Sequence, residues 1–239
     1  MSAQKISDNP SGVQRDKHYF STRVLKVIHH TQDIFELHLE RHNLNFAPGE
    51  YISIQTPTLD IYREYSIASG IHDDHLGFII KHLQKGVVTD YLASRKTGDR
   101  ITVGHPQGLF RPGQSHQEGE FVFIATGTGI APFLSYIKSY PSAPPAHFMY
   151  GVRYLRDALY FDLFQSHCPS TLVISREHVT PFPRGRVTDL LPRLPLHQNV
   201  HYYLCGLDSM IEDVTNWLKN NGISRKQIHH EIFFYSQNP

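Results

Sequence analysis

Polar and apolar residues alternate along the first half of the chain, in short runs that end at turn residues. Alternation with period two and many β-branched residues is typical of half-buried β-strands. The clearest runs cover 23–28, 34–39, 51–54 and 78–81. Turn signals such as Pro48-Gly49 separate them, so we predict an antiparallel β-barrel or sandwich. One helix is expected over 88–96, ended by Gly98.

From residue 120 onward the pattern changes to short continuous apolar runs that alternate with stretches of helical spacing. The apolar runs cover 121–125, 147–150, 171–174 and 201–205, and the helical stretches cover 131–140, 159–166 and 209–221. Strands that alternate with helices predict a parallel α/β sheet. We therefore expect two domains, a β-barrel domain over 17–112 and an α/β domain over 119–239, joined by a segment that contains Pro112 and two glycines.

The composition excludes several classes of function. The chain has 23 basic and 22 acidic residues, a balance that argues against general nucleic-acid binding. Its 17 histidines lack a metal-binding spacing, so we predict no metal site. The two cysteines, Cys168 and Cys205, are too few for a four-cysteine iron–sulfur cluster or zinc site within the chain.

Two further features concern location. No run of eighteen apolar residues is present, so we expect no membrane insertion. Residues 1–16 are polar and lack the apolar core of a signal peptide. We interpret them as a flexible N-terminal arm and expect a cytoplasmic protein.

A glycine-rich turn follows the apolar run 121–125 and opens the next helical stretch. Its sequence is Gly127-Thr128-Gly129-Ile130-Ala131-Pro132. Glycines permit a tight turn and a close approach of backbone to a ligand, and the N–H groups at a helix start favour an anion. The turn is therefore a candidate dinucleotide site, although the same pattern also suits a plain connection between strand and helix.

A second motif, Arg63-Glu64-Tyr65-Ser66, lies at a strand end in the first half. An Arg can neutralise a phosphate, a Tyr can cover an aromatic ring, and a Ser hydroxyl can bond to a ring nitrogen. A solvated Arg beside ordinary strand residues is the competing interpretation.

Taken together and in this order, the two motifs resemble those of the ferredoxin–NADP reductase superfamily, over about Tyr19 to Phe234. The resemblance implies that Arg63 contacts a flavin phosphate, Tyr65 packs on the isoalloxazine and Ser66 approaches its N5. The family's second flavin element matches Gly86-Val87-Val88-Thr89, where backbone amides would hold the pyrophosphate. Lys81 is a further candidate cofactor contact.

The nicotinamide side of the family pattern is also present. Gly127, Thr128 and Gly129 belong to the matching turn, and Cys205-Gly206 matches a motif near the last strand, with Leu207 in place of the usual Pro or Asn. The resemblance implies that Cys205 lies where the nicotinamide stacks on the flavin. A small buried apolar Cys is the alternative.

Coenzyme choice depends on basic and hydroxyl side chains in the α/β domain. The candidates are Arg153, Ser175, Arg176 and Arg186. Guanidinium groups suit the doubly charged 2′-phosphate of NADPH. We therefore expect NADPH, with NADH as the alternative, because solvated loop arginines also occur in NADH-using relatives.

The resemblance extends to the C-terminus, where the family has a glutamate followed two residues later by an aromatic that covers the flavin. Glu231 and Phe233 have this spacing. Phe234 or Tyr235 could instead be the covering residue, and ordinary core packing is a further interpretation of Phe233.

The resemblance thus predicts a reductase with tightly but non-covalently bound FAD, FMN being the less favoured flavin. Hydride would pass between NADPH and flavin N5, with Ser66, Cys205 and Glu231 as catalytic residues, and single electrons would pass to a separate ferredoxin or flavodoxin. The alternatives are a reductase component of an oxygenase system, a non-turnover relay subunit of a larger complex, or a flavin-binding sensor module. The oligomeric state and the direction of electron flow stay open.

Overall fold

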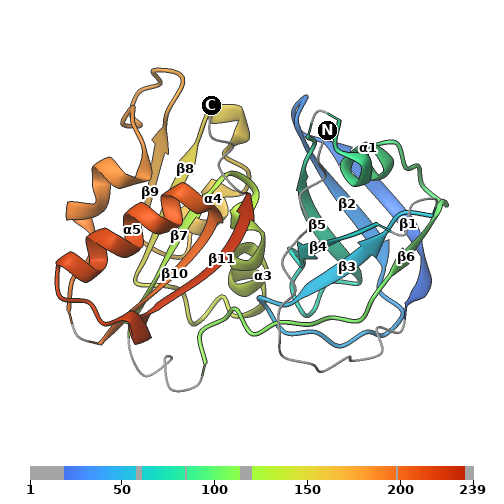
Figure 1. Ribbon diagram of the computed structural model, residues 1–239, viewed down its shortest axis with the longest axis horizontal. Coiled ribbons are helices and arrows are strands. Elements are labelled where there is room, and N and C mark those ends of the chain that lie inside the picture. Colours follow the sequence, from blue (N-terminus) through green and yellow to red (C-terminus); the bar gives the residue numbers. More distant parts are fainter. Residues whose placement is uncertain (1–18, 58–60, 84, 114–119, 198, 235–239) are drawn as a thin grey trace, which may run out of the picture.

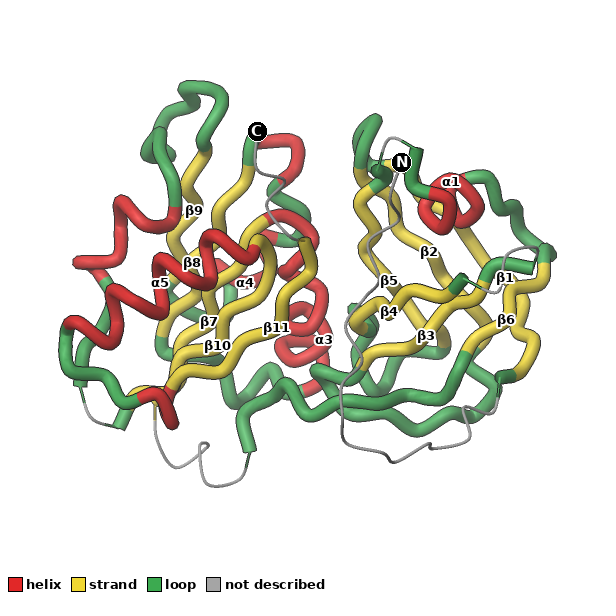
Figure 2. The backbone as a smooth tube through the Cα atoms, viewed as in Figure 1, coloured by secondary structure: helices red, strands yellow, loops and turns green. Residues whose placement is uncertain are grey.

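The computed structural model describes residues 19–57, 61–83, 85–113, 120–197 and 199–234. The N-terminal arm predicted at 1–16 lies outside the described residues. The chain forms two sheets side by side, with helix α3 (Ala131–Ser139) between them (Figure 1). Figure 2 shows that the loop after the first sheet runs toward the second.

The first sheet is antiparallel and contains six strands among the described residues. They are β1 (Phe20–His29), β2 (Ile34–Glu40), β3 (Tyr51–Gln55), β4 (Tyr62–Ser66), β5 (His75–Lys81) and β6 (Arg100–Val103). Their order is β4-β3-β6-β1-β2-β5. The two strands at the ends of this order, β4 and β5, also contact each other, so the sheet curls toward a barrel. Helix α1 (Val87–Ala93) follows β5.

Strand β2 of the first sheet has one face in the core of its own domain and the other toward the second domain. On β2, Phe35, Leu37 and Leu39 are at most 1% exposed and join the core of the β domain. Glu36 lies on the opposite face of the strand, where an exposed position is expected for a carboxylate, yet it is only 4% exposed. The outer face of β2 is therefore covered by the second domain.

The second sheet is parallel and contains five strands among the described residues. They are β7 (Glu120–Thr126), β8 (His147–Val152), β9 (Ser170–Ile174), β10 (Val200–Leu207) and β11 (Ile228–Phe234), in the order β11-β10-β7-β8-β9. The other helices are α4 (Phe161–Gln165) and α5 (Asp208–Asn220), with 3-10 turns η1 (Gly127–Ile130), η2 (Leu155–Asp157), η3 (Val187–Arg193) and η4 (Arg225–Gln227).

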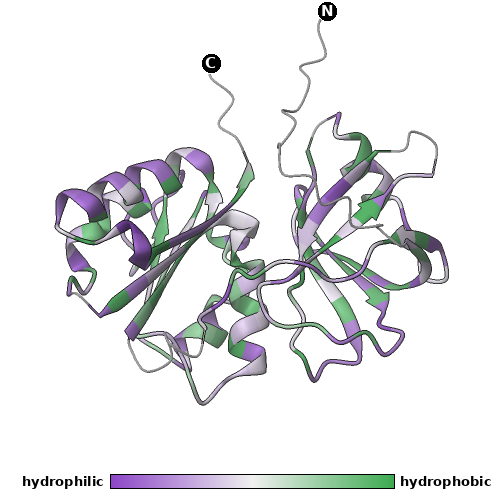
Figure 3. Ribbon diagram, turned by 60° about the horizontal axis from the view of Figure 1, so that its bottom comes forward, coloured by the Kyte–Doolittle hydropathy of each residue, from purple (hydrophilic) through white to green (hydrophobic). Residues whose placement is uncertain are grey.

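Each face of the parallel sheet has its own apolar core. Helix α5 and η3 cover one face, and α5 buries Met210, Ile211, Val214 and Leu218, the spacing of an amphipathic helix. Figure 3 accordingly shows green and purple residues alternating along this helix. The core on the other face, under α3 and α4, also includes Ile34, Ala68 and Ile79 from the β domain. A shared apolar core therefore joins the two domains.

The predicted fold class, an antiparallel β domain followed by a parallel α/β domain, is confirmed. Two predicted helices are shorter than expected: α1 ends at Ala93, and α4 begins at Phe161 because Tyr160 adopts a left-handed φ of 58°. The patterns of β6 and β11 were too short or too mixed to be predicted as strands. Within the described part of the chain, no helix has the length and apolar character needed to cross a membrane.

Candidate active site

The three predicted catalytic residues come together where the two domains meet. Ser66 is the last residue of β4, and its Oγ donates a hydrogen bond to Oε2 of Glu231 on β11 at 2.9 Å. The β10–β11 register places Glu231 directly beside Cys205. Ser66 is 4% exposed and Cys205 is fully buried, whereas Glu231 is half-buried. A side-chain cluster from three strands thus lies at the domain boundary, partly shielded from bulk water.

Burial determines the protonation of this cluster. It raises the pKa of Glu231 to about 6, with the Ser66 hydrogen bond opposing the rise and the negative charge of Glu64 adding to it. Burial, followed by the charge of Glu231, raises the pKa of the Cys205 thiol well above its ordinary value. Cys205 is therefore a neutral thiol at pH 7 rather than a thiolate nucleophile, whereas Glu231 can change charge near neutral pH.

The glycines of the predicted dinucleotide turn have separate tasks. A Cβ on Gly129 would lie 2.4 Å from the carbonyl oxygen of Cys205, so only glycine lets the turn approach β10 this closely. Gly127 has a φ of 55°, and a Cβ there would meet nothing within 4 Å. The space around Gly127 is thus open to a ligand, whereas Gly129 serves close packing of backbone. Thr128 is only 3% exposed, so its side chain is not open to a ligand.

A threonine connects this turn to the Cys205-Gly206 motif. Thr126 Oγ1 accepts a hydrogen bond from the backbone N–H of Leu207 at 3.0 Å. Gly206 has a φ of 138°, and a Cβ there would come within 2.1 Å of the same Oγ1. The sequence analysis missed Thr126, although its position directly before Gly127 is a usable signal.

The flavin motif lies on β4, next to β3. Because side chains alternate along a strand, Arg63 and Tyr65 share one face and Glu64 and Ser66 the other. Arg63 is exposed, and its Nη1 donates to the carbonyl of Tyr62 at 2.8 Å. Burial raises the pKa of the Tyr65 phenol, against the charge of Arg63, so the ring is neutral. The arrangement offers a cation and an aromatic face on one side of the strand.

The second flavin element surrounds the start of α1. The Thr89 hydroxyl donates to the carbonyl of Gly86 at 3.0 Å and accepts from the N–H of Leu83 at 3.2 Å. Thr89 and Val88 are buried, and a Cβ on Gly86 would lie 2.4 Å from the Thr89 hydroxyl. These side chains shape the loop itself, so an anion here would bind to the backbone N–H groups of the first helical turn.

Basic side chains from both domains lie where strands β5, β8 and β9 end. Lys81 ends β5, Arg153 follows β8 and Arg176 follows β9, and the N–H of Arg176 donates to the carbonyl of Arg153 at 2.9 Å. Burial first, and then the positive charge of Arg153, lower the pKa of Lys81; the carboxylates of Asp33 and Asp157 oppose this shift, and the more weakly coupled Arg176 adds to it. Three cations therefore lie within electrostatic reach of one another, a disposition that suits phosphate groups.

The remaining candidates differ in exposure and in hydrogen bonding. Arg186 is exposed at the start of η3, and its N–H donates to Oδ2 of Asp189 at 2.8 Å. The Ser175 hydroxyl donates to the carbonyl of Val152 at 3.2 Å. Phe233 is partly buried and packs against the core under α3 and α4, so both of the roles weighed for it are compatible with its position.

Sequence reasoning also missed a polar interface between the domains. The Tyr160 hydroxyl donates to Oε1 of Glu36 at 2.6 Å, and the same carboxylate receives hydrogen bonds from His30 at 2.9 Å and His38 at 3.0 Å. Burial raises the pKa of Glu36, but the hydrogen bonds from His38, Tyr160 and His30 outweigh it and hold that pKa at about 2. The only signal in the sequence was a Glu inside an apolar strand. Among the described residues no cluster of His, Cys, Asp and Glu could hold a metal.

The residues present fit a flavin dinucleotide and a nicotinamide coenzyme. The fit depends on the open space at Gly127, the buried Ser66 hydroxyl that bonds to the second domain, the Tyr65 ring, and the cations Lys81, Arg153 and Arg176. Of these residues only Tyr65 and Ser66 are neighbours in the sequence. The others come from distant parts of the chain, so it is the fold that supplies the complete set.

Comparison with known proteins agrees with this geometry. Residues 23–111 match the oxidoreductase FAD-binding domain family, and residues 123–216 match the oxidoreductase NAD-binding domain family. The chain is 31% identical over 202 residues to the toluate 1,2-dioxygenase electron transfer component of Pseudomonas putida, covering 80% of this chain and 59% of that protein. It is 26% identical over 230 residues to the ferredoxin–NADP reductase of Azotobacter vinelandii, covering 84% and 89%.

A solved structure shares the fold. The ferredoxin–NADP reductase of Neisseria gonorrhoeae with bound FAD and NADP superposes with a TM-score of 0.82 at 21% identity, over 92% of this chain and all of that one. The chain spans about three fifths of the length of the Pseudomonas putida relative. With both domain families matched in the same order, the chain belongs to the ferredoxin–NADP reductase family of NAD(P)H-dependent flavin oxidoreductases.

Proposed function

We propose that this chain is an FAD-dependent ferredoxin/flavodoxin–NADP reductase, with residues 17–112 as the FAD domain and 119–239 as the NADP domain. The observation that carries the proposal is the hydrogen bond from Ser66 to Glu231, because it joins the flavin motif of one domain to the last strand of the other beside Cys205. A chain that only bound a flavin would have no need of a second domain that completes the site.

FAD, when bound, supplies a ring that exchanges a hydride with the nicotinamide and single electrons with a protein partner. Arg63 neutralises a phosphate of the cofactor, Tyr65 covers the ring, and the backbone from Gly86 to Thr89 holds the pyrophosphate. The role of these residues is to bind the flavin and to orient it. The redox chemistry belongs to the cofactors.

Ser66, Glu231 and Cys205 would determine which hydrogen bonds reach the flavin ring near N5. Ser66 Oγ offers one hydrogen atom, which it donates to Glu231 when that carboxyl is ionised. When Glu231 is protonated, it can donate to Ser66 instead, and the Ser66 hydrogen becomes available to the ring. Cys205, buried and neutral, is small enough to leave space for the nicotinamide.

The coenzyme is NADPH in this proposal. Arg153, Arg176 and Arg186 are exposed at the ends of β8 and β9 and the start of η3, and Ser175 is adjacent. Guanidinium groups bind a 2′-phosphate through charge-assisted hydrogen bonds. NADH lacks that phosphate and would gain less from them.

The electron partner is a ferredoxin or flavodoxin. Support comes from the Azotobacter vinelandii ferredoxin–NADP reductase, nearly the full length of which aligns with this chain. A second candidate is the reductase component of an oxygenase system. It is favoured by the higher identity to the toluate dioxygenase component, of which the chain covers only 59%.

One experiment tests these assignments. Purified protein loaded with FAD is mixed with NADPH or NADH, and bleaching of the flavin absorbance is followed by stopped flow. Ferredoxin, flavodoxin and an oxygenase component are then offered as acceptors. Fast bleaching by NADPH and turnover with ferredoxin or flavodoxin support the proposal. Protein that binds neither FAD nor FMN, or holds flavin that neither coenzyme bleaches, would contradict it.

A further inference from the structure

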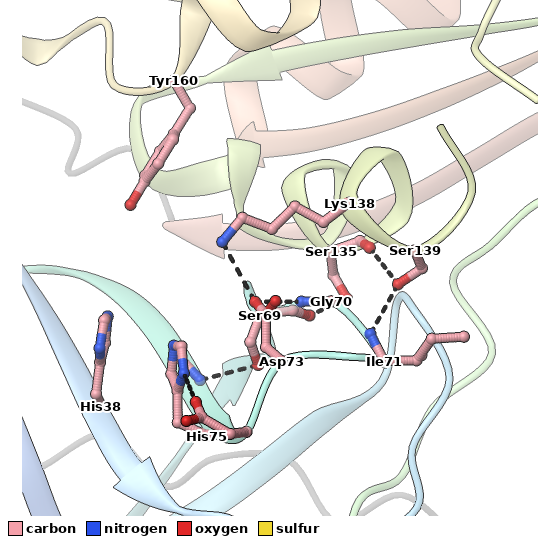
Figure 4. A network of polar contacts seen from close by, with 12 residues as sticks. His38, Ser69, Gly70, Ile71, Asp73, His75, Ser135, Lys138, Ser139 and Tyr160 are labelled. Carbon is pink, nitrogen blue, oxygen red and sulfur yellow. Dashed lines mark hydrogen bonds and ion pairs between the residues drawn. The ribbon is translucent and has the colours of Figure 1, made fainter. Parts of the chain in front are cut away.

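Helix α3 is attached to the β domain by two buried serine hydroxyls (Figure 4). Ser135 Oγ donates to the carbonyl of Ser69 at 2.7 Å, and both residues are at most 1% exposed. Ser139 Oγ donates to the carbonyl of Ser135 at 2.6 Å and accepts from the N–H of Ile71 at 3.0 Å. The helix therefore supplies both an acceptor and a donor to the segment 69–71.

The contact is also sterically close. A Cβ on Gly70 would lie 2.9 Å from Cβ of Lys138, so the backbone of segment 69–71 lies directly against the helix. Such a contact between close-packed groups transmits displacement, because protein interiors have little free volume.

Segment 69–71 and helix α3 are each connected along the chain to a part of the proposed site. Segment 69–71 begins three residues after Ser66, the end of the flavin strand β4. Helix α3 begins directly after the turn Gly127–Ile130. The hydroxyl contacts thus connect the segment that follows the strand proposed to face the flavin with the helix that follows the turn proposed to hold the coenzyme.

We infer that Ser135 and Ser139 are positioning residues that fix the distance between the flavin and the nicotinamide. The inference rests on the proposed function of Tyr65, Ser66 and the Gly127–Ile130 turn. Neither serine touches the reacting groups. Each acts through the backbone that it holds.

The other polar contacts across this boundary are weaker candidates for that task. Lys138 and Asp73 form an ion pair at 3.4 Å, but both side chains are about 30% exposed, and such pairs contribute little. The Tyr160–Glu36 hydrogen bond is short, yet Tyr160 precedes α4 and leads away from the glycine turn. Ser66 and Glu231 also bond across the boundary, but that contact joins β4 to β11. The two serines instead join segment 69–71 to the helix that follows the glycine turn.

Hydride transfer is sensitive to such positioning. Reacting atoms must approach within about 3–3.5 Å, and a misplacement of about 1 Å can lower the rate roughly a hundredfold. Loss of the Ser135 hydroxyl would leave the buried carbonyl of Ser69 without this donor, so the segment would shift toward another partner.

The test uses flavin-loaded Ser135→Ala and Ser139→Ala variants, with Thr22→Val as the matched control. Thr22 is fully buried, and its hydroxyl donates to the carbonyl of Glu40 at 2.8 Å, wholly within the β domain. We expect the flavin-reduction rate at saturating coenzyme to fall about tenfold to a hundredfold in Ser135→Ala. Flavin content and coenzyme Kd should stay within about twofold, and the control should keep its rate.

Hydrogen–deuterium exchange supplies a readout that does not need turnover. Amides of 69–73 and 127–139 should exchange faster in both serine variants than in wild type, while amides of β8 and β9 stay unchanged. Wild-type rates in both folded variants would overturn the inference, and so would an equal fall in Thr22→Val. A wild-type protein whose flavin neither coenzyme reduces would instead contradict the proposed function. Even in that case, unchanged amide exchange at 69–73 in the serine variants would show that the two hydroxyls do not hold this segment in place.

Discussion

The Ser66 hydroxyl donates to the carboxylate of Glu231 at 2.9 Å, across 165 positions of the chain and across the boundary between two sheets. This contact joins the last residue of β4 in one domain to the last strand of the other. It also links the hydroxyl proposed to face the flavin to a group whose pKa is raised to about 6 by burial. The charge of Glu231 therefore changes close to physiological pH.

The first prediction concerns pH. Below about pH 6 Glu231 is protonated, and the Ser66 hydrogen is available to the ring; above it the carboxylate binds that hydrogen. Flavin reduction by NADPH should therefore speed up several-fold as the pH falls through about 6. Glu231→Gln, which is neutral at every pH, should flatten the profile near the low-pH rate. Stopped-flow rates from pH 5 to 8 measure this, and an unchanged midpoint in the variant would refute it.

The second prediction isolates the charge next to Ser66. Glu64 lies on the same face of β4, and its negative charge contributes to the raised pKa of Glu231. Glu64→Gln should lower that pKa, so the midpoint of the rate profile should move to lower pH without loss of bound flavin. Glu64→Asp keeps the charge and serves as the control. A midpoint that moves equally in both variants would mean that packing, not charge, is responsible.

Much of the site could be read from local sequence. The glycine turn and the β4 motif are contiguous, and their residue types constrain backbone and chemistry at once. The contact between Ser66 and Glu231 could be expected only through the family resemblance, since no local pattern connects these positions. The partners in the Tyr160–Glu36 bond and in the α3 serine contacts could not be predicted, because a polar residue in an apolar run, such as Glu36, does not identify the group it binds. Strand β11 mixes His, Glu and Phe, and neither period two nor period 3.6 emerges from it.

The third prediction concerns coenzyme choice. Arg176→Ala combined with Arg186→Ala removes two cations proposed to bind the 2′-phosphate. With about 1.5–3 kcal/mol for each charged hydrogen bond, the KM for NADPH should rise at least tenfold to a hundredfold. The KM for NADH should change much less. Arg193→Ala combined with Arg225→Ala, at the far end of η3 and the start of η4, also removes two positive charges and serves as the control. Equal effects on the two coenzymes would contradict the phosphate assignment.

The fourth prediction concerns the glycine turn. A methyl group at Gly129 would lie 2.4 Å from the carbonyl oxygen of Cys205, a backbone atom that cannot rotate away. Gly129→Ala should therefore destabilise the protein by about 1–3 kcal/mol and weaken coenzyme binding. Gly222→Ala is the control: its Cβ meets nothing within 4 Å, and its φ of 85° costs only about 1–2 kcal/mol. Urea unfolding measures the stability of both variants, and coenzyme titration measures binding, which only Gly129→Ala should weaken.

The last prediction concerns the domain interface. Tyr160→Phe removes the 2.6 Å hydrogen bond to Glu36 and leaves His30 and His38 as donors. Loss of a hydrogen bond to a buried carboxylate should lower the free energy of unfolding by about 1–3 kcal/mol at pH 7. Tyr136→Phe is the matched control, because the buried Tyr136 hydroxyl has no hydrogen-bond partner among the described residues, so its removal should be neutral.

The pH dependence of Tyr160→Phe has a defined sign. The folded-state pKa of Glu36, about 2, lies below its ordinary value of 4.5, so its contribution to stability is complete above pH 4.5 and is lost as the pH falls through about 2. Without Tyr160 that pKa rises, because one of the hydrogen bonds that lower it is gone. Tyr160→Phe should therefore lose less stability than wild type or Tyr136→Phe as the pH falls below 4.5, so its deficit at pH 7 should shrink in acid. Urea unfolding between pH 3 and 7 measures the difference, and parallel curves for the three proteins would show that the Tyr160 bond does not stabilise the ionised carboxylate.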